Sequence, residues 1–129
     1  MKNLLLFIPF LLAAASAAEP PSAVVTPLML KTLADFPGKE ALMLNVVYPP
    51  GSKDHAHRHD AHAFVYVLEG SIIMQLQGSE PVTLTAGQTF YEGPSDVHLI
   101  GRNASTTKPA RFVVVLIKTQ GVDAVLPVN

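Results

Sequence analysis

The sequence predicts an all-β domain built as a sandwich or a barrel. From residue 28 onward, short apolar segments recur at regular intervals and are bounded by glycine and proline turns, a pattern typical of these folds. No segment after the N-terminal stretch shows a helical period of useful length. The chain has 129 residues, 49% of them hydrophobic, which is enough for one domain with its own core.

The N-terminus has the pattern of a secretory signal peptide. Lys2 gives a basic start, residues 4–12 are apolar except for Pro9, and residues 13–18 are small. Cleavage fits equally well after Ala17 or Ala18. An uncleaved membrane anchor is the alternative, but about 20 apolar residues are needed to span a bilayer and this run is shorter. We therefore expect residues 1–18 to be removed and the mature protein to be secreted, or periplasmic in a Gram-negative host, without further membrane contact.

The remaining elements follow in order. A proline-rich extended arm is expected at residues 19–27, a barrel at 28–120 and a C-terminal tail at 121–129. Within the barrel, strands are predicted at residues 28–33, 40–48, 63–68, 72–77, 82–84, 89–91, 98–100 and 112–118, with a polar loop at 102–109. Pro49-Pro50-Gly51 ends the second strand because proline lacks the donor for a strand ladder.

The histidines form the most informative cluster. Four of the five lie between His55 and His62, and the fifth is His98. His55, His57 and His59 alternate, so in an extended segment they project to one side. Imidazole is the commonest metal-ligating side chain near neutral pH. The chain has no cysteine, so a metal must be held by nitrogen and oxygen ligands.

The same residues also allow plainer interpretations. A histidine-rich loop can be a solvated tract that binds metal adventitiously. His55 is expected to be an exposed loop residue, and Asp54 and Asp60 are either solvated turn residues or carboxylates that orient an imidazole. Tyr91 and Glu92, just before the turn to His98, are candidates for polar residues of a pocket.

Charge argues against a nucleic-acid partner. The formal net charge is -1 and the lysines and arginines form no cluster. Because nucleic-acid binding depends on phosphate neutralisation, we expect no such partner.

Two stretches resemble the two motifs of the cupin family, in the family's order and spacing. The first comprises Gly51, His57-Arg58-His59 and the strand end Tyr66–Gly70, and the second comprises Gly87, Gly93-Pro94 and His98. Five residues separate Gly51 from His57, and His98 lies eleven positions after Gly87. The resemblance covers nearly the whole mature chain. It implies a double-stranded β-helix, or jelly-roll barrel, with a single metal inside.

Carried over by position, the resemblance implies that His57, His59 and His98 are metal ligands. The family's fourth ligand, usually a glutamate, falls at Ala63. His62 is one residue earlier, and a one-residue shift in a strand turns a side chain to the opposite face. A bulge at residues 60–61 would restore His62 as the fourth ligand; otherwise a water molecule takes that position.

The ligand types suit one divalent transition metal, either Fe, Zn, Ni, Mn or Cu, without selecting among them. The resemblance implies a small-molecule substrate handled by oxygenase or by isomerase or lyase chemistry. A non-catalytic module that binds a small ligand or a metal is the alternative. No residue stands out as a general base. Because cupins are often dimers and residues 24–33 resemble an edge strand able to pair with a partner's sheet, a homodimer is also expected.

Overall fold

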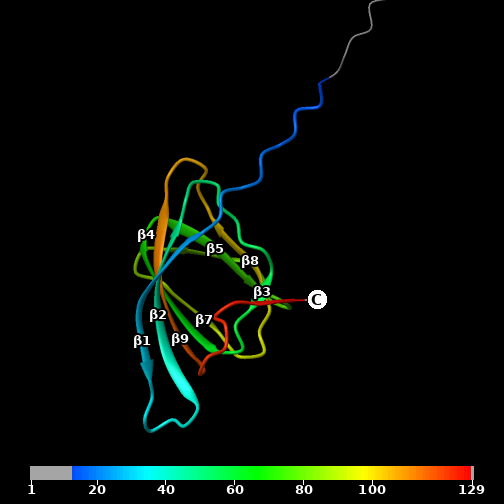
Figure 1. The fold of residues 1–129 in the computed structure, drawn as a ribbon. Helices are drawn as coiled ribbons and strands as arrows, with labels where there is room; N and C mark the ends of the chain where they lie inside the picture. Colours follow the sequence, from blue (N-terminus) through cyan, green and yellow to red (C-terminus); the bar gives the residue numbers. More distant parts are fainter. Residues whose placement is uncertain (1–12, 129) are drawn as a thin grey trace, which may run out of the picture.

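The computed structural model describes residues 13–128 as two five-stranded antiparallel sheets that pack face to face (Figure 1). The ten strands are β1 (Val24–Thr32), β2 (Lys39–Tyr48), β3 (His57–Arg58), β4 (His62–Glu69), β5 (Ser71–Leu76), β6 (Val82–Thr85), β7 (Thr89–Glu92), β8 (His98–Asn103), β9 (Ala110–Thr119) and β10 (Leu126–Pro127). One sheet has the order β1-β2-β9-β4-β7 and the other β10-β3-β8-β5-β6. The all-β prediction is confirmed. Within this described part, no helix is long and apolar enough to cross a membrane.

The core lies between the inner faces of the two sheets. Val67 and Leu116 from the first sheet and Ile72 and Met74 from the second belong to one buried cluster. β9 shows why the sequence folds this way, since its buried residues alternate with more exposed ones along its length. Its inner face is apolar from Ala110 to Leu116, and it pairs with β2 on one side and β4 on the other. Burying this central strand therefore organises the first sheet.

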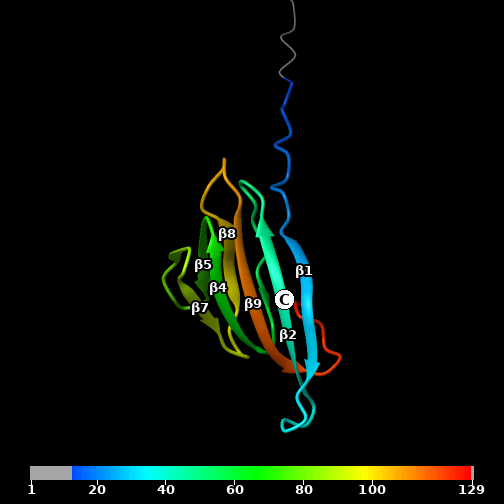
Figure 2. The ribbon, with the colours of Figure 1, turned by 90° about the vertical axis from the view of Figure 1, so that its left-hand side faces the viewer.

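The N-terminal strand is longer than the sequence predicted. β1 begins at Val24, so residues 24–27, expected in the extended arm, are part of the sheet and pair with β2. Pro27 is tolerated because β1 is an edge strand, where a missing backbone donor does little harm. Figure 2 shows β1 beside β2 at the margin of the sheet. Residues 13–22 have no regular structure, and residues 1–12 of the expected signal peptide lie outside the described residues.

The C-terminal segment also differs from the expected tail. Leu126 and Pro127 form β10, which pairs with Arg58 and His57 of β3. A strand of two residues has no periodicity that a sequence can display, which explains why it was not predicted. This pairing places the C-terminal strand beside β3, which carries His57 (Figure 1).

A buried ion pair links the end of β9 to the start of β2 in the first sheet. The Nζ atom of Lys118 on β9 lies 2.5 Å from Oε1 of Glu40 on β2, and the two residues are direct partners across the strands. Both residues are buried. The hydrogen bond from Lys118 holds the pKa of Glu40 below its ordinary value.

Candidate metal centre

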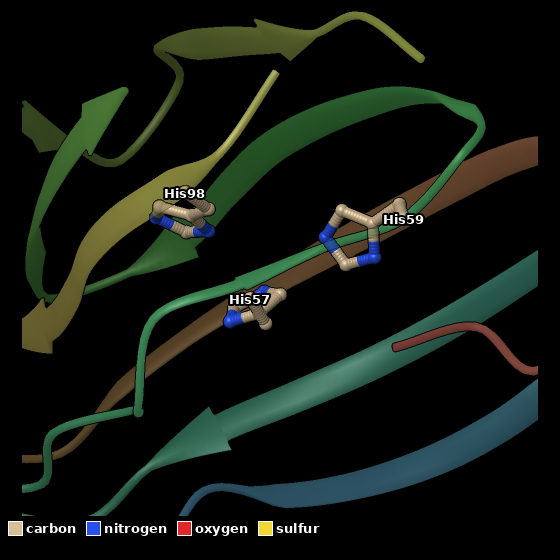
Figure 3. Close-up of side chains that lie close together, drawn as sticks. All are labelled: His57, His59 and His98. Carbon is tan, nitrogen blue, oxygen red and sulfur yellow. The ribbon is translucent and has the colours of Figure 1, made fainter. Parts of the chain in front are cut away.

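Three histidines that are far apart in the sequence converge on one point. His57 on β3 and His98 on β8 are direct cross-strand partners, and His59 follows β3. One ligand nitrogen from each residue lies within 4.8 Å of the others. The centroid of the His57 ring is 4.8 Å from the centroids of both other rings (Figure 3). These three residues are therefore the ones that the structure brings together as a possible metal site.

Two of the rings are held through the same nitrogen. His57 Nδ1 donates to the carbonyl oxygen of His55 at 2.8 Å, and His59 Nδ1 donates to the carbonyl oxygen of Ala124 at 2.5 Å. A carbonyl oxygen only accepts, so each Nδ1 carries the proton and each Nε2 keeps its lone pair. An Nδ1–H bond to a backbone carbonyl is a common way of orienting a metal-ligating histidine.

His98 is the most deeply placed of the three. It is 3% exposed, and neither ring nitrogen has a hydrogen-bond partner within residues 13–128. Burial, reinforced by the neighbouring His57, lowers the pKa of His98 to about 4. Burial also lowers the pKa of His59. Both imidazoles are therefore neutral near pH 7, which is the state that binds a metal.

Glu92 adds a carboxylate to the cluster. Its Oε2 atom lies 3.4 Å from His59 Nε2, and its Oε1 atom lies 3.4 Å from His98 Nδ1. Glu92 is 3% exposed, and burial, with a smaller effect of Asp96, raises its pKa to about 7. β7 alternates between faces, so Glu92 points inward whereas Tyr91 points outward. Of these two candidate pocket residues, only Glu92 reaches the histidines.

The residues present fit a divalent transition metal. Both nitrogens of His98 and Oε2 of Glu92 are buried without a hydrogen-bond partner in the described chain. An unsatisfied buried polar group costs about 1–3 kcal/mol, so burying several of them together favours a shared cation. Neutral imidazoles with a carboxylate are a donor set that suits Zn, Fe, Ni or Cu.

The family comparison agrees with this arrangement. Residues 44–116, more than half of the chain, match the family model of the cupin domain. The chain is a cupin. No curated protein matches it.

Solved structures show the same barrel. A conserved protein with a double-stranded β-helix domain from Klebsiella pneumoniae is 16% identical, with a TM-score of 0.66 over 87% of this chain and 90% of that one. A cupin domain from Bordetella pertussis is 23% identical, with a TM-score of 0.60 over 80% and 100%. The DMSP lyase DddQ from Ruegeria pomeroyi is 19% identical, with a TM-score of 0.58 over 64% of this chain; the cupin spans only 41% of that structure. These similarities confirm the predicted double-stranded β-helix.

His62 lies apart from the cluster. It is exposed on the outer side of β4, and its Nδ1 is 2.6 Å from the hydroxyl of Tyr91. Ala63 points inward and is fully buried. The bulge that would have turned His62 inward does not form, since Asp60 instead adopts a left-handed turn conformation with φ 47° before β4 begins. The structure therefore does not bring His62 to the other three histidines. His55 is exposed, as expected.

A cavity of about 700 Å³ opens beside the histidines. Its walls are mainly aliphatic and aromatic and come from both sheets, including Leu42, Leu44, Met74, Phe112, Val114 and Leu116. The N-terminal and C-terminal segments also contribute to it. This volume is within the range of small-molecule sites.

A tyrosine and an aspartate supply polar groups on the cavity wall. The hydroxyl of Tyr48 donates a hydrogen bond to Asp54. Burial, together with Asp54, raises the pKa of Tyr48, so its hydroxyl stays protonated. A Cβ at Gly101 would lie 2.7 Å from the Tyr48 hydroxyl and 3.0 Å from Cε1 of His98. A glycine at this position therefore leaves room for both the Tyr48 hydroxyl and the His98 ring.

Proposed function

We propose that this cupin is an exported metalloprotein that binds a small organic molecule beside one divalent transition metal held by His57, His59 and His98. The observation that carries the proposal is the convergence of the three imidazoles at the wall of an apolar cavity. Bound there, the metal supplies Lewis acidity that polarises an oxygen of the ligand.

The chain's own residues define what the cavity accepts. The aliphatic walls take the apolar part of a ligand and exclude water from it. Two polar groups lie near the histidines. They are the Tyr48 hydroxyl, which donates its hydrogen bond to Asp54, and the carboxyl group of Glu92. The occupant therefore has an apolar body and one oxygen-bearing end.

Titratable groups on the cavity wall favour an enzyme over a module that only binds its ligand. An enzyme needs an acid or a base near the reacting atoms, and the hydrogen-bonded pair of Tyr48 and Asp54 lines the cavity. Oxygenase and isomerase or lyase chemistry are the two reaction classes. The largely apolar lining favours a second candidate, a module that binds its ligand without turnover. Product formation from a bound ligand separates the two.

Straight-chain carboxylates from acetate to octanoate test the proposal. Calorimetric titration of the zinc-loaded, tag-free protein is expected to show affinity that rises about fourfold per added methylene until the cavity is full. Removing the metal, or replacing His57 by alanine, is expected to remove the contribution of the carboxylate group and so lower the affinity of every carboxylate in the series. Absence of zinc binding, or affinity that is independent of both chain length and metal, would contradict the proposal.

Export is supported by the N-terminal pattern, with its basic start, apolar run and small residues before Glu19. The absence of cysteine is compatible with an oxidising compartment. The proposed place of action is therefore outside the cytoplasm.

The outer face of the first sheet supports a homodimer. Cross-strand pairs join Met29, Met43, Val115, Phe64 and Tyr91 into a line across all five strands, here named the outer apolar row. Met29, Phe64 and Tyr91 in this row are exposed. The row reaches β1, the edge strand of the sheet. A second copy that pairs its own β1 antiparallel to this edge extends the sheet and the row symmetrically, so the proposed occupant is another molecule of this chain.

A further inference from the structure

Ala63 and Glu92 face each other across the antiparallel pair of β4 and β7. Ala63 occupies the position at which the cupin motif carries its glutamate ligand, and it offers only a methyl group. Both residues are buried on the inner face of the sheet. Directly opposed residues have Cβ atoms about 4.5–5.5 Å apart. The backbone of Glu92 on β7 therefore lies directly beside Ala63, the position on β4 where the motif carries its glutamate.

One carboxylate oxygen of Glu92 lies at ligand spacing from a nitrogen of His59. Its Oε2 atom is 3.4 Å from His59 Nε2, the nitrogen left free by the bond from Nδ1 to Ala124. Two ligand atoms about 2.1 Å from one cation in a tetrahedral arrangement lie about 3.4 Å apart. Oε2 also has no hydrogen-bond partner among the residues that the structure covers. A shared cation would satisfy both atoms.

We propose that Glu92 supplies the fourth, carboxylate ligand of the metal centre, so that the glutamate missing from β4 is replaced by its cross-strand neighbour on β7. The inference rests on the proposed metal-binding function. Three neutral imidazoles and one carboxylate then form the ligand set, and His62 has no part in it. The competing role for Glu92 is that of a positioning residue, because its Oε1 atom also lies 3.4 Å from His98 Nδ1.

Metal titration of five proteins separates these roles: the wild type, Glu92→Gln, Glu92→Ala, Ala63→Glu, and the double variant Ala63→Glu/Glu92→Ala. Affinity is measured with Co²⁺ in competition with a chelator, and the visible spectrum of the bound Co²⁺ reports its coordination. Glu69→Gln, which alters an exposed carboxylate paired with Arg111, is the control. Circular dichroism and thermal unfolding check that each variant folds.

Glu92→Ala is expected to weaken Co²⁺ binding by about 100-fold or more, at or beyond the upper end of the loss seen when an orienting partner is removed. The Co²⁺ spectrum is expected to change in Glu92→Ala and in the isosteric Glu92→Gln. The double variant, which returns the carboxylate to β4, is expected to recover most of the affinity. Ala63→Glu alone is expected to give no tightening, because the carboxylate position is already filled.

Two results would overturn the inference while leaving the proposed function intact. One is a Glu92→Gln variant with an unchanged Co²⁺ spectrum and an affinity within about threefold of the wild type, well below even the loss of an orienting partner. The other is tighter binding in Ala63→Glu, which would show that the position was open. Failure of the wild type itself to bind Co²⁺ would instead contradict the proposed function. If Glu92→Ala does not fold, the spectrum of Glu92→Gln decides.

Discussion

His57 and His98 are direct partners across the antiparallel pair of β3 and β8. Opposed residues in such a pair project to the same face, so this register alone places one histidine of each motif side by side. His59, two positions after His57, completes the cluster at the same wall of the cavity. The proposed metal centre is thus a consequence of strand register.

Removing a clustered histidine is expected to remove the metal. His57→Ala and His98→Ala should each lower zinc affinity by more than the roughly 10- to 100-fold that follows loss of an orienting partner, because a donor atom is lost. Zinc content after dialysis, measured by mass spectrometry of the element, gives the result.

His62→Ala is the matched control for these variants. His62 is exposed and bonded to Tyr91, so its loss is expected to leave one zinc per chain. Zinc retained in His57→Ala, or lost in His62→Ala, would contradict the three-histidine site.

The sequence predicts the three-histidine cluster because motif order and spacing are visible along the chain. Whether His62 or Glu92 lies near the three histidines is not visible in the sequence, because this depends on which residues of β4 and β7 face inward. Asp60 adopts a left-handed turn conformation, and the bulge that would have restored His62 as a ligand is absent. β4 begins with His62 outward and Ala63 inward. On β7 the alternation places Phe90 and Glu92 on the same side, a signal that marks Glu92 over Tyr91 once a strand at residues 89–92 is assumed.

The two ends of the barrel were harder to predict, for different reasons. In a sequence, a proline such as Pro27 predicts the end of a strand. At the edge of a sheet it is compatible with pairing, and β1 continues through it. β10 is held by its pairing with β3, a long-range contact without a local pattern. The hydrogen bond from His59 to Ala124 therefore had no sequence signal.

The buried pair of Glu40 and Lys118 predicts an acid-dependent loss of stability. The pKa of Glu40 is lowered in the folded state, so the unfolded state binds more protons at acid pH. The stabilisation is present above the ordinary pKa of 4.5 and is lost as the pH falls through the lower, folded value. Urea unfolding of the wild type is expected to show this decrease in free energy.

Glu40→Gln is expected to be less stable than the wild type at neutral pH and to depend less on pH in the acid range. Glu69→Gln removes an exposed pair worth less than about 1 kcal/mol and should retain the wild-type slope. An acid slope unchanged by Glu40→Gln would rule out this pair as its source.

The outer apolar row predicts an association of two chains. Light scattering during size-exclusion chromatography is expected to give the mass of a dimer for the mature protein. Met29→Glu places a charge on the exposed face of β1, the strand that forms the proposed interface, and should yield a folded monomer. The exposed substitution Arg102→Glu, on the other sheet, is the control. A wild-type monomer at micromolar concentration would contradict the dimer.

Export predicts a defined mature N-terminus. When the full chain is expressed in a Gram-negative host, the protein recovered by osmotic shock is expected to begin at Ala18 or Glu19, as read from its intact mass. Replacing Leu5 and Leu6 by glutamate should keep the uncleaved chain in the cytoplasm. Full-length protein in the cytoplasm of the wild-type strain would contradict export.

Anomalous diffraction from crystals of the zinc-loaded protein tests the central claim most directly. The account predicts one anomalous peak per chain, about 2.0–2.1 Å from Nε2 of His57 and His59 and bonded to a ring nitrogen of His98. A peak elsewhere, or one that contacts only His55 and His62, would contradict it.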